Sequence, residues 1–534
     1  MNRLYNLANS LYYTYVNPSF NQLIQPFKSN LMKLTGGSIG LVGAFTIYHT
    51  HDNESSNKQC TCPEHTSTHT NELLYSHTLY NQSIVSHCPS MQQFCPPRYI
   101  TNPHVQTIIA SLYRLSPSNE SAPFNLLQSI TQYIPFTSYI QQYIQKHSIA
   151  TDNNNVILQQ SAGPTTANNT GIDINKITYT RELVQLPDGG TVSLDWHTPL
   201  DNDNSIKHNN KPILLCLHGL TGGSLEAYMQ WIVHATAKHT DCQIVVMNAR
   251  GCGNTKLSTP VPFNAANTDD LRYVIQKLRK DVIGNDVSMY AVGVSLGSGI
   301  LLKYVHEESM KYKQHNNNNN TVQSISNNNQ NKQVGGLNGS IHVCTSFDHK
   351  HNTQSMEQSL VNFYLYNKTL GSNLVAYLKN HHDIFMNNLH TITKRFDLST
   401  AYSSSYIGEF DRNVIVPLFN YNTVDDYYSH ASTKYSLRDV EIPCLVLSSK
   451  DDPICSVACV DIDAVNYNDN VIMCLTTHGG HVGYIESSTT DKHKRESISS
   501  HGFHHLPLNI ESYIEKPIIE FINAVQYNKQ HNIV

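Results

Sequence analysis

Residues 289–305 read MYAVGVSLGSGILLKYV, and this stretch decides the fold. Its first residues, from Met289 to Val292, are continuously apolar, which is typical of a strand buried on both faces. Its last residues, from Ile300 to Val305, have the apolar content of a helix. They are joined by Gly293-Val294-Ser295-Leu296-Gly297, a G-x-S-x-G pattern that is typical of a sharp turn with an exposed serine. The glycines leave room for the strand and the helix to approach each other.

The chain around this stretch alternates between strand-like and helix-length segments. Apolar runs at Ile213 to Leu217 and at Ile244 to Met247 predict two more buried strands, each followed by a segment long enough for a helix. Ahead of them, Glu182 to Leu186 and Thr191 to Trp196 flank the turn Asp188-Gly189-Gly190 and predict a hairpin. The sequence therefore predicts an α/β fold with a mostly parallel central sheet and helices on both faces.

A carboxylate that can orient an imidazole is predicted after a later strand. The run Cys444 to Ser448 reads as a strand and leads into Asp451-Asp452-Pro453-Ile454. A carboxylate at such a strand end can hold a catalytic histidine in place. Asp452 is the preferred acid because a small turn residue and an apolar residue follow it, and Asp451 is the alternative.

A histidine that can act as a base follows the next predicted strand, Asn470 to Leu475. The order serine, acid, histidine is the one expected after a G-x-S-x-G turn, and it excludes most of the 29 histidines of the chain. Of the histidines that follow the acid, only His478 and His481 lie directly after a predicted strand, in the loop His478-Gly479-Gly480-His481-Val482-Gly483. We predict that His481 is the base, since the glycines let it reach Ser295, and that His478 hydrogen-bonds the loop.

Backbone N–H groups that can stabilise an oxyanion are predicted in the loop after strand 213–217. This loop reads His218-Gly219-Leu220-Thr221-Gly222-Gly223. The N–H groups of Leu220 and Leu296 are the candidate donors. We interpret His218 as a structural loop residue, because the backbone does the chemistry at this position.

These residues predict an enzyme that forms an acyl-enzyme on Ser295. Water as the acceptor would make it an esterase or lipase, and an alcohol would make it an acyltransferase. Dehalogenation is disfavoured because it needs a carboxylate nucleophile. The rival from another class is a catalytically silent binding protein tethered to a membrane.

No cofactor and no metal is predicted. Cys60 and Cys62 with His65 and His69 match no standard zinc spacing. The formal net charge of −5 and the pI near 6.6 offer no basic surface for nucleic acid. The predicted partner is an acyl ester or lipid, with a membrane as a second candidate, and the sequence identifies no protein partner.

Three parts are predicted along the chain: an N-terminal segment over residues 1–50, a polar linker over 51–90 and one α/β domain over 91–534. The N-terminal segment contains a candidate membrane anchor at 34–48. The domain contains an Asn-rich disordered insertion at 312–336 and a cap region at 347–432. The stretch 34–48 is short for a span, so a buried or interfacial helix is its alternative. Residues 124–143 have an amphipathic helical pattern. Six apolar residues of the cap have two alternative interpretations: they line an acyl site, or they form ordinary helical core. They are Phe363, Tyr364, Leu370, Leu374, Tyr377 and Leu378.

Further motifs extend the pattern well beyond these residues. They are Arg98 to Ile108, Asp195-Trp196, Asn248-Ala249-Arg250-Gly251-Cys252-Gly253, Asp269-Asp270-Leu271, Glu409-Phe410-Asp411 and Asp425-Asp426-Tyr427-Tyr428. From about residue 95 onward, the chain resembles the fourth family of the α/β-hydrolase superfamily. That family includes medium-chain fatty-acid ethyl ester synthase/esterases and membrane-linked abhydrolase-domain lipases and phospholipases.

The resemblance implies an α/β-hydrolase fold with a helical cap insertion. By resemblance, the nucleophile falls on Ser295, the acid on Asp452 and the base on His481. The family commonly has an N-terminal membrane anchor, which implies attachment of the endoplasmic reticulum or lipid-droplet type, with a soluble cytoplasmic protein as the alternative. The departures from the family are the Asn-rich insertion, the weakly hydrophobic candidate anchor, and Ala249, where a histidine often stands.

Overall fold

The computed structural model describes residues 69–97, 101–112, 177–197, 211–318, 332–487 and 510–533. The candidate anchor at 34–48 and the amphipathic pattern at 124–143 lie outside these residues. Within the described ranges, no helix is both long and apolar enough to span a bilayer.

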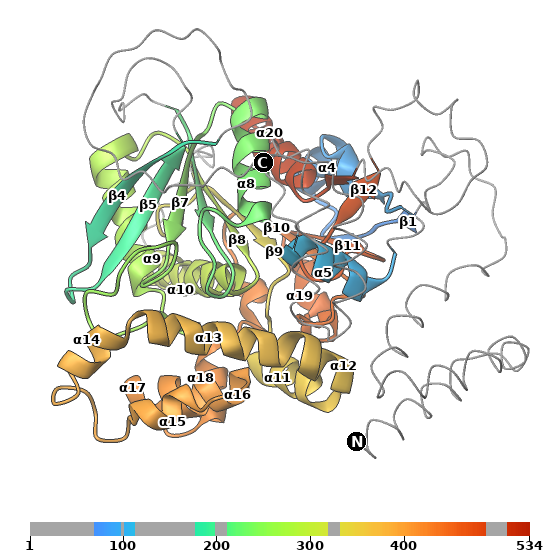
Figure 1. Ribbon diagram of the computed structural model, residues 1–534. Coiled ribbons are helices and arrows are strands. Elements are labelled where there is room, and N and C mark those ends of the chain that lie inside the picture. The colour runs from blue at the N-terminus through green and yellow to red at the C-terminus, as the bar shows by residue number, and fades with distance from the viewer. Residues whose placement is uncertain are drawn as a thin grey trace, which may run out of the picture. The chain divides into compact units, whose positions relative to one another are not determined.

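A nine-stranded sheet forms the centre of the domain, in the order β2-β11-β10-β9-β8-β6-β7-β5-β4 (Figure 1). The six strands from β11 to β7 in this order are parallel to one another. Strand β2 at one edge, and strands β5 and β4 at the other, are antiparallel to the strands they pair with. The strands are β2 (Glu72–Tyr75), β4 (Tyr179–Gln185), β5 (Thr191–His197), β6 (Ile213–Leu217), β7 (Gln243–Asn248), β8 (Met289–Val294), β9 (Gly339–Val343), β10 (Cys444–Ser449) and β11 (Val471–Thr476). The predicted parallel sheet and the predicted hairpin of β4 and β5 are confirmed.

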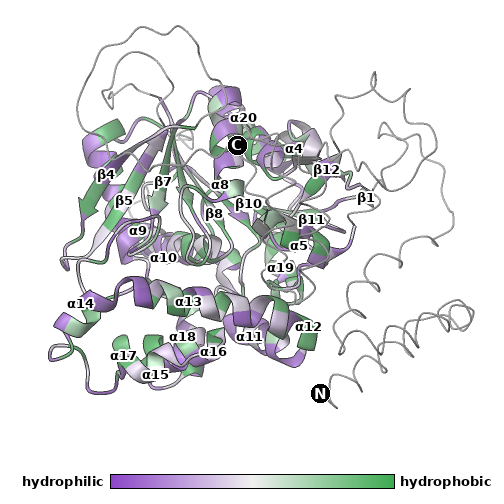
Figure 2. Ribbon diagram, viewed as in Figure 1, coloured by the Kyte–Doolittle hydropathy of each residue, from purple (hydrophilic) through white to green (hydrophobic). Residues whose placement is uncertain are grey.

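The parallel strands are apolar throughout because helices cover both faces of the sheet. Along β6, Leu215 belongs to one buried cluster, and its neighbours Leu214 and Cys216 belong to the other. Hydrophobic residues run along the strands in Figure 2, whereas the helices also carry hydrophilic ones. One face packs on α9 (Asp269–Leu278), α10 (Leu296–Asn318) and α19 (Ile462–Tyr467), and the other packs on α4 (Leu79–Ser86), α8 (Ala227–His239) and α20 (Glu515–Gln530).

Residues 69–90 are part of the fold, although the sequence analysis places them in a linker. Strand β2 pairs with β11, and Ile84 of α4 is fully buried. The hydroxyl of Ser83 donates a hydrogen bond to the side chain of Asn528 in α20 at 2.6 Å. The linker prediction is therefore wrong for residues 69–90. Although the segment is rich in polar residues, Ile84 and Cys88 are buried in the same hydrophobic cluster as Ile518 and Phe521 of α20.

The Asn-rich insertion is shorter than the predicted range 312–336. Helix α10 continues to Asn318, and Tyr312 packs against the core. On the other side, Val334 is buried and pairs with Leu337, and the carbonyl of Gly336 accepts hydrogen bonds from Arg279. Only residues 319–331 of the predicted insertion lie outside the described part of the chain.

The cap consists of helices between β9 and β10, and Figure 1 shows them gathered on one side of the sheet. They are α11 (His349–Gln358), α12 (Leu360–Asn362), the π-helical turn η5 (Phe363–Asn367), α13 (Lys368–Asn380), α14 (His382–Asn387), α15 (Leu398–Tyr402), α16 (Ile407–Phe410), the π-helical turn η6 (Asp411–Ile415), α17 (Val416–Leu418) and α18 (Val424–Ala431). The cap shares a hydrophobic cluster with the loop after β7, and Leu374, Tyr377 and Leu378 belong to it together with Cys252 and Leu257 of that loop. These three residues of the cap are therefore helical core.

Arg250, in the loop after β7, connects three parts of the domain. Its guanidinium donates two hydrogen bonds to the carboxylate of Asp270 in α9, both at 2.7 Å, and lies 2.7 Å from a carboxylate oxygen of Asp188 in the hairpin turn. Its carbonyl oxygen accepts a hydrogen bond from the hydroxyl of Tyr377 in α13 at 2.9 Å. The next carbonyl, of Gly251, accepts one from the Nε2 of His381 at 2.9 Å. Several motifs that are far apart in the sequence therefore meet at this loop.

The buried carboxyl group of Asp411 in the cap generates a prediction about stability. It accepts a hydrogen bond from the hydroxyl of Tyr428 at 2.7 Å, and burial raises its pKa from 3.8 to about 7. Between these two values the folded chain binds more protons than the unfolded chain, so the free energy of unfolding falls as the pH rises through this window and stays low above it. We expect Asp411→Asn to be more stable than the wild type above this window, by on the order of 1 kcal/mol or more.

The advantage of Asp411→Asn should shrink as the pH falls toward the pKa of the unfolded carboxyl. Thermal unfolding of both proteins at about pH 5 and about pH 8 measures this difference. A difference in melting temperature of the same size at both pH values would contradict the assignment.

Candidate active site

Ser295 lies in a strained turn between β8 and α10. Its φ is +54°, in the left-handed region that residues other than glycine rarely adopt. A Cβ atom on Gly293 would lie 2.5 Å from the carbonyl oxygen of Gly297, and one on Gly297 would lie 2.5 Å from the carbonyl oxygen of His218. Any larger residue at either position would collide with backbone. The sequence therefore needs glycine on both sides of the serine for the turn to close.

The side chains of Ser295, His481 and Asp452 form one hydrogen-bonded series. The Nε2 of His481 lies 2.9 Å from the Oγ of Ser295, and its Nδ1 lies 2.8 Å from Oδ2 of Asp452. A carboxylate accepts only, so Nδ1 carries the proton and Nε2 is free to accept the serine proton. The three residues follow the ends of β8, β11 and β10, which meet at one edge of the parallel sheet.

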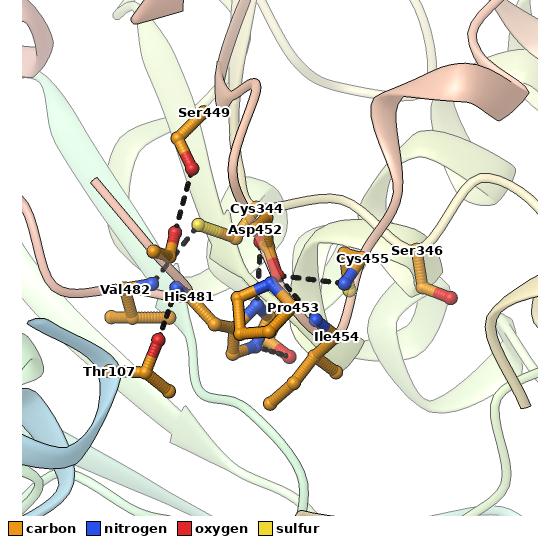
Figure 3. A network of polar contacts seen from close by, with 12 residues as sticks. Thr107, Cys344, Ser346, Ser449, Asp452, Pro453, Ile454, Cys455, His481 and Val482 are labelled. Atoms are coloured by element: carbon orange, nitrogen blue, oxygen red, sulfur yellow. Dashed lines mark hydrogen bonds and ion pairs between the residues drawn. The ribbon is translucent and has the colours of Figure 1, made fainter. Parts of the chain in front are cut away.

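The carboxylate of Asp452 is enclosed and has partners on both oxygens. Its Oδ1 accepts hydrogen bonds from the N–H groups of Ile454 and Cys455, each at 2.8 Å (Figure 3). Its side chain is only 1% exposed. A buried carboxylate that is hydrogen-bonded in this way avoids the large cost of an unpaired charge. Ile454 and Cys455 therefore stabilise the buried carboxylate through their backbone N–H groups.

Asp451, the alternative acid, faces a different set of groups. Its Oδ1 accepts hydrogen bonds from the hydroxyl of Ser449 and the N–H of Gly480, both at 2.9 Å, and its Oδ2 lies 3.2 Å from Nδ1 of His478. The structure thus pairs Asp452 with His481 and Asp451 with His478. The sequence predicted the first pair, whereas the ring of His478, predicted to hydrogen-bond its own loop, lies against Asp451 in the loop after β10.

The loop after β6 lies directly against the serine. A Cβ on Gly219 would lie 3.4 Å from the Cβ of Ser295. The N–H of Gly219 is taken by the hydroxyl of Tyr228 at 2.8 Å. In the part of the chain that the structure describes, the N–H groups of Leu220 and Leu296 donate no hydrogen bond. Leu296 is the first residue of α10, where N–H groups have no partner within the helix.

His218 holds this loop in place through both ring nitrogens. Its Nε2 accepts a hydrogen bond from the N–H of Ala249 at 3.1 Å, and its Nδ1 therefore donates to the carbonyl of Gly219 at 2.7 Å. Burial lowers the pKa of this imidazole, which keeps it neutral. These contacts agree with the interpretation of His218 as a structural residue.

A pocket opens beside the serine turn and the 218–220 loop. Its walls include Gly219 and Leu296 next to the serine, together with Ala249 and Phe263 from the loop after β7. Most of its surface is apolar, although Arg250 also lines it. Its volume is only about 50 Å³ and Ser295 is not part of its wall, whereas ligand pockets usually measure about 300 Å³ or more, so this pocket does not hold a whole acyl chain.

The six cap residues that the sequence analysis names for an acyl site or helical core do not line this pocket. Leu374, Tyr377 and Leu378 are buried in the hydrophobic cluster that the cap shares with the loop after β7, whereas Tyr364 is exposed. Phe363 and Leu370 are half-buried. The helical-core alternative therefore describes Leu374, Tyr377 and Leu378.

Two residues that contact the histidine loop are not among the predicted site residues. The hydroxyl of Thr107, in α5 (Pro103–Leu112), accepts a hydrogen bond from the N–H of His481 at 2.8 Å. The Sγ of Cys344, directly after β9, accepts one from the N–H of Val482 at 3.3 Å. Both partners are distant in the sequence, and the only signal for Thr107 was its place in the motif Arg98 to Ile108.

The same region contains a group of side chains with metal-ligand chemistry. Ligand atoms of Cys344, Asp452 and His481 lie within 4.8 Å of one another, and no other such group occurs among the described residues. Asp452 and His481 are already hydrogen-bonded to each other, and His481 also to Ser295. Hydrogen bonding therefore accounts for the arrangement of this group.

Comparison with known proteins agrees with this geometry. Residues 212–488 match the family model described as the alpha/beta hydrolase fold. Human phospholipase ABHD3 is 31% identical over 316 residues, which cover 58% of this chain and 68% of that protein. The monoacylglycerol lipase of Saccharomyces cerevisiae is 26% identical over 352 residues, covering 59% and 71%. Medium-chain fatty acid ethyl ester synthase/esterase 2 of the same yeast is 24% identical over 365 residues, covering 58% and 75%. The chain belongs to the α/β-hydrolase fold family.

Proposed function

We propose that this chain is a serine hydrolase that cleaves the acyl groups of lipid or medium-chain esters through an acyl-enzyme on Ser295. The observation that carries the proposal is the hydrogen-bonded series of Ser295, His481 and Asp452. The N–H groups of Leu220 and Leu296, which donate no hydrogen bond among the described residues, support it. The names of the relatives, a phospholipase, a monoacylglycerol lipase and an ethyl ester synthase/esterase, support the substrate class.

In the proposed mechanism, Nε2 of His481 takes the proton of Ser295 while the serine oxygen attacks the ester carbonyl. Asp452 keeps the imidazole in the required tautomer and stabilises its charged form. The N–H groups of Leu220 and Leu296 would stabilise the oxyanion. The imidazolium then gives its proton to the departing alcohol, and an ester of Ser295 remains. Water, activated by the same imidazole, releases the fatty acid and restores the serine.

Acyl transfer to an alcohol is the second candidate, on the same residues. The similarity to the ethyl ester synthase/esterase supports it. Turnover of an acyl ester in buffer with ethanol, followed by separation of free acid from ethyl ester, distinguishes the two acceptors.

Attachment to a membrane through residues 34–48 is a further part of the proposal. Membrane fractionation of cells that express the full chain, compared with cells that express a form without residues 1–60, tests it.

Replacing the proposed nucleophile should abolish both covalent labelling and turnover. A fluorophosphonate probe should label the wild type and release of p-nitrophenol from a medium-chain ester should be measurable, whereas Ser295→Ala should show neither. Ser298→Ala is the matched control, because Ser298 is a buried serine in the first turn of α10 and its hydroxyl contacts Thr345 instead of His481. Labelling of Ser295→Ala would overturn the nucleophile, and a wild type without labelling would favour the catalytically silent alternative.

The two neighbouring aspartates should differ in their effect on rate. Asp452→Asn should lower kcat by roughly a thousand-fold or more, because an amide no longer fixes the tautomer of His481. Asp451→Asn should cost less than about ten-fold, because Asp451 contacts the loop and not the imidazole of His481. Steady-state kinetics of both variants on one ester gives the comparison. A larger loss of kcat in Asp451→Asn than in Asp452→Asn would make Asp451 the catalytic acid and contradict the assignment.

A further inference from the structure

The loop that carries His481 has an unusual backbone. Gly480, Val482 and Tyr484 have φ values of +55°, +61° and +42°, and that of Gly479 is +152°. A β-branched residue such as valine is a genuine outlier in the left-handed region. For residues other than glycine, such conformations persist only where the surroundings enforce them. The position of His481 therefore depends on the groups that hold this loop.

Helix α5 holds one side of the loop. The hydroxyl oxygen of Thr107 accepts a hydrogen bond from the backbone N–H of His481 at 2.8 Å, as Figure 3 shows. The same hydroxyl donates to the carbonyl of Pro103, also at 2.8 Å. Its proton is thus directed away from the loop and its lone pair toward His481. Thr107 is 2% exposed, so water does not readily replace it.

The fit between α5 and the loop is close along its length. A Cβ on Gly480 would lie 2.5 Å from the carbonyl oxygen of Pro103, and one on Gly483 would lie 2.7 Å from the Cβ of Gln106. The N–H of Ile485 donates to the side-chain oxygen of Gln106 at 3.3 Å. Glycines in the loop therefore allow the first turns of α5 to approach the backbone beside His481.

Other groups hold the opposite side of the loop. The N–H of Gly480 donates to Asp451, and the N–H of Val482 donates to Cys344. Loss of the Thr107 hydroxyl would thus leave the loop attached but would remove the hydrogen bond on the residue that carries the imidazole. The expected result is a displaced imidazole, not an unfolded domain.

We infer that Thr107 is a positioning residue for His481, and that α5 is a supporting element of the active site although it lies outside residues 212–488 of the family match. The inference rests on the proposed function, in which His481 is the base. Displacement of a base weakens proton transfer in the transition state and leaves ground-state binding unchanged. The effect should therefore fall on kcat and not on KM.

The test compares Thr107→Val, which keeps the shape and removes the hydroxyl, with Thr107→Ser, which keeps the hydroxyl. We expect Thr107→Val to lower kcat roughly ten-fold with KM within about two-fold, and Thr107→Ser to stay within about three-fold of the wild type. Thr391→Val, at an exposed threonine of the cap, is the matched control and should match the wild type. The rate of fluorophosphonate labelling should follow kcat.

An unchanged kcat in Thr107→Val, an equal loss in Thr107→Ser, or a change confined to KM would overturn the inference. If circular dichroism shows that Thr107→Val does not fold, Thr107→Ala takes its place, because it removes the same acceptor without adding an atom. Thr107→Ser, which keeps the hydroxyl, is then compared with Thr107→Ala. Failure of the proposed function looks different, since the wild type itself would then show no labelling or turnover.

Discussion

The left-handed backbone at Ser295 is the constraint on which the rest of the site depends. It turns the chain from β8 into α10 within a single residue, and the close approach of Gly297 to the carbonyl of His218 brings the loop after β6 against the same point. The serine and the start of α10 thereby lie directly against the loop after β6. The two glycines leave the space that this strained turn needs.

The imidazole is held in place from several elements. Asp452 can remain buried because both of its oxygens have partners, and two of those partners are backbone N–H groups of the residues that follow it. The loop of His481 is anchored by the residues after β10, by the residue after β9 and by α5. A fixed base needs little reorganisation at the moment of proton transfer, which is the physical advantage of such anchoring.

The sequence predicted the parallel sheet because strands buried on both faces are continuously apolar, as β6 and β8 are. It missed β2, a strand of four residues whose partner lies about four hundred residues further along the chain. It distinguished Asp451 from Asp452 only by the residues that follow them, because two adjacent side chains have almost the same sequence context and differ mainly in the direction in which the fold points them. The role of Thr107 was out of reach for the same reason, since its partner is the backbone N–H of a residue 374 positions away.

The attachment of the cap to the loop after β7 has a consequence for how the chain can change over time. Tyr377 and His381 bind carbonyl oxygens of Arg250 and Gly251, and every amino acid supplies such an oxygen. Substitution in the cap can delete these donors, and the loop is restricted as well. Gly251 has a φ of +72°, and a Cβ on it would lie 2.7 Å from the ring of Tyr377 and 2.8 Å from Nε2 of His381. A larger residue at position 251 would displace both donors, so changes in cap orientation among descendants of this chain can originate on either side of this contact.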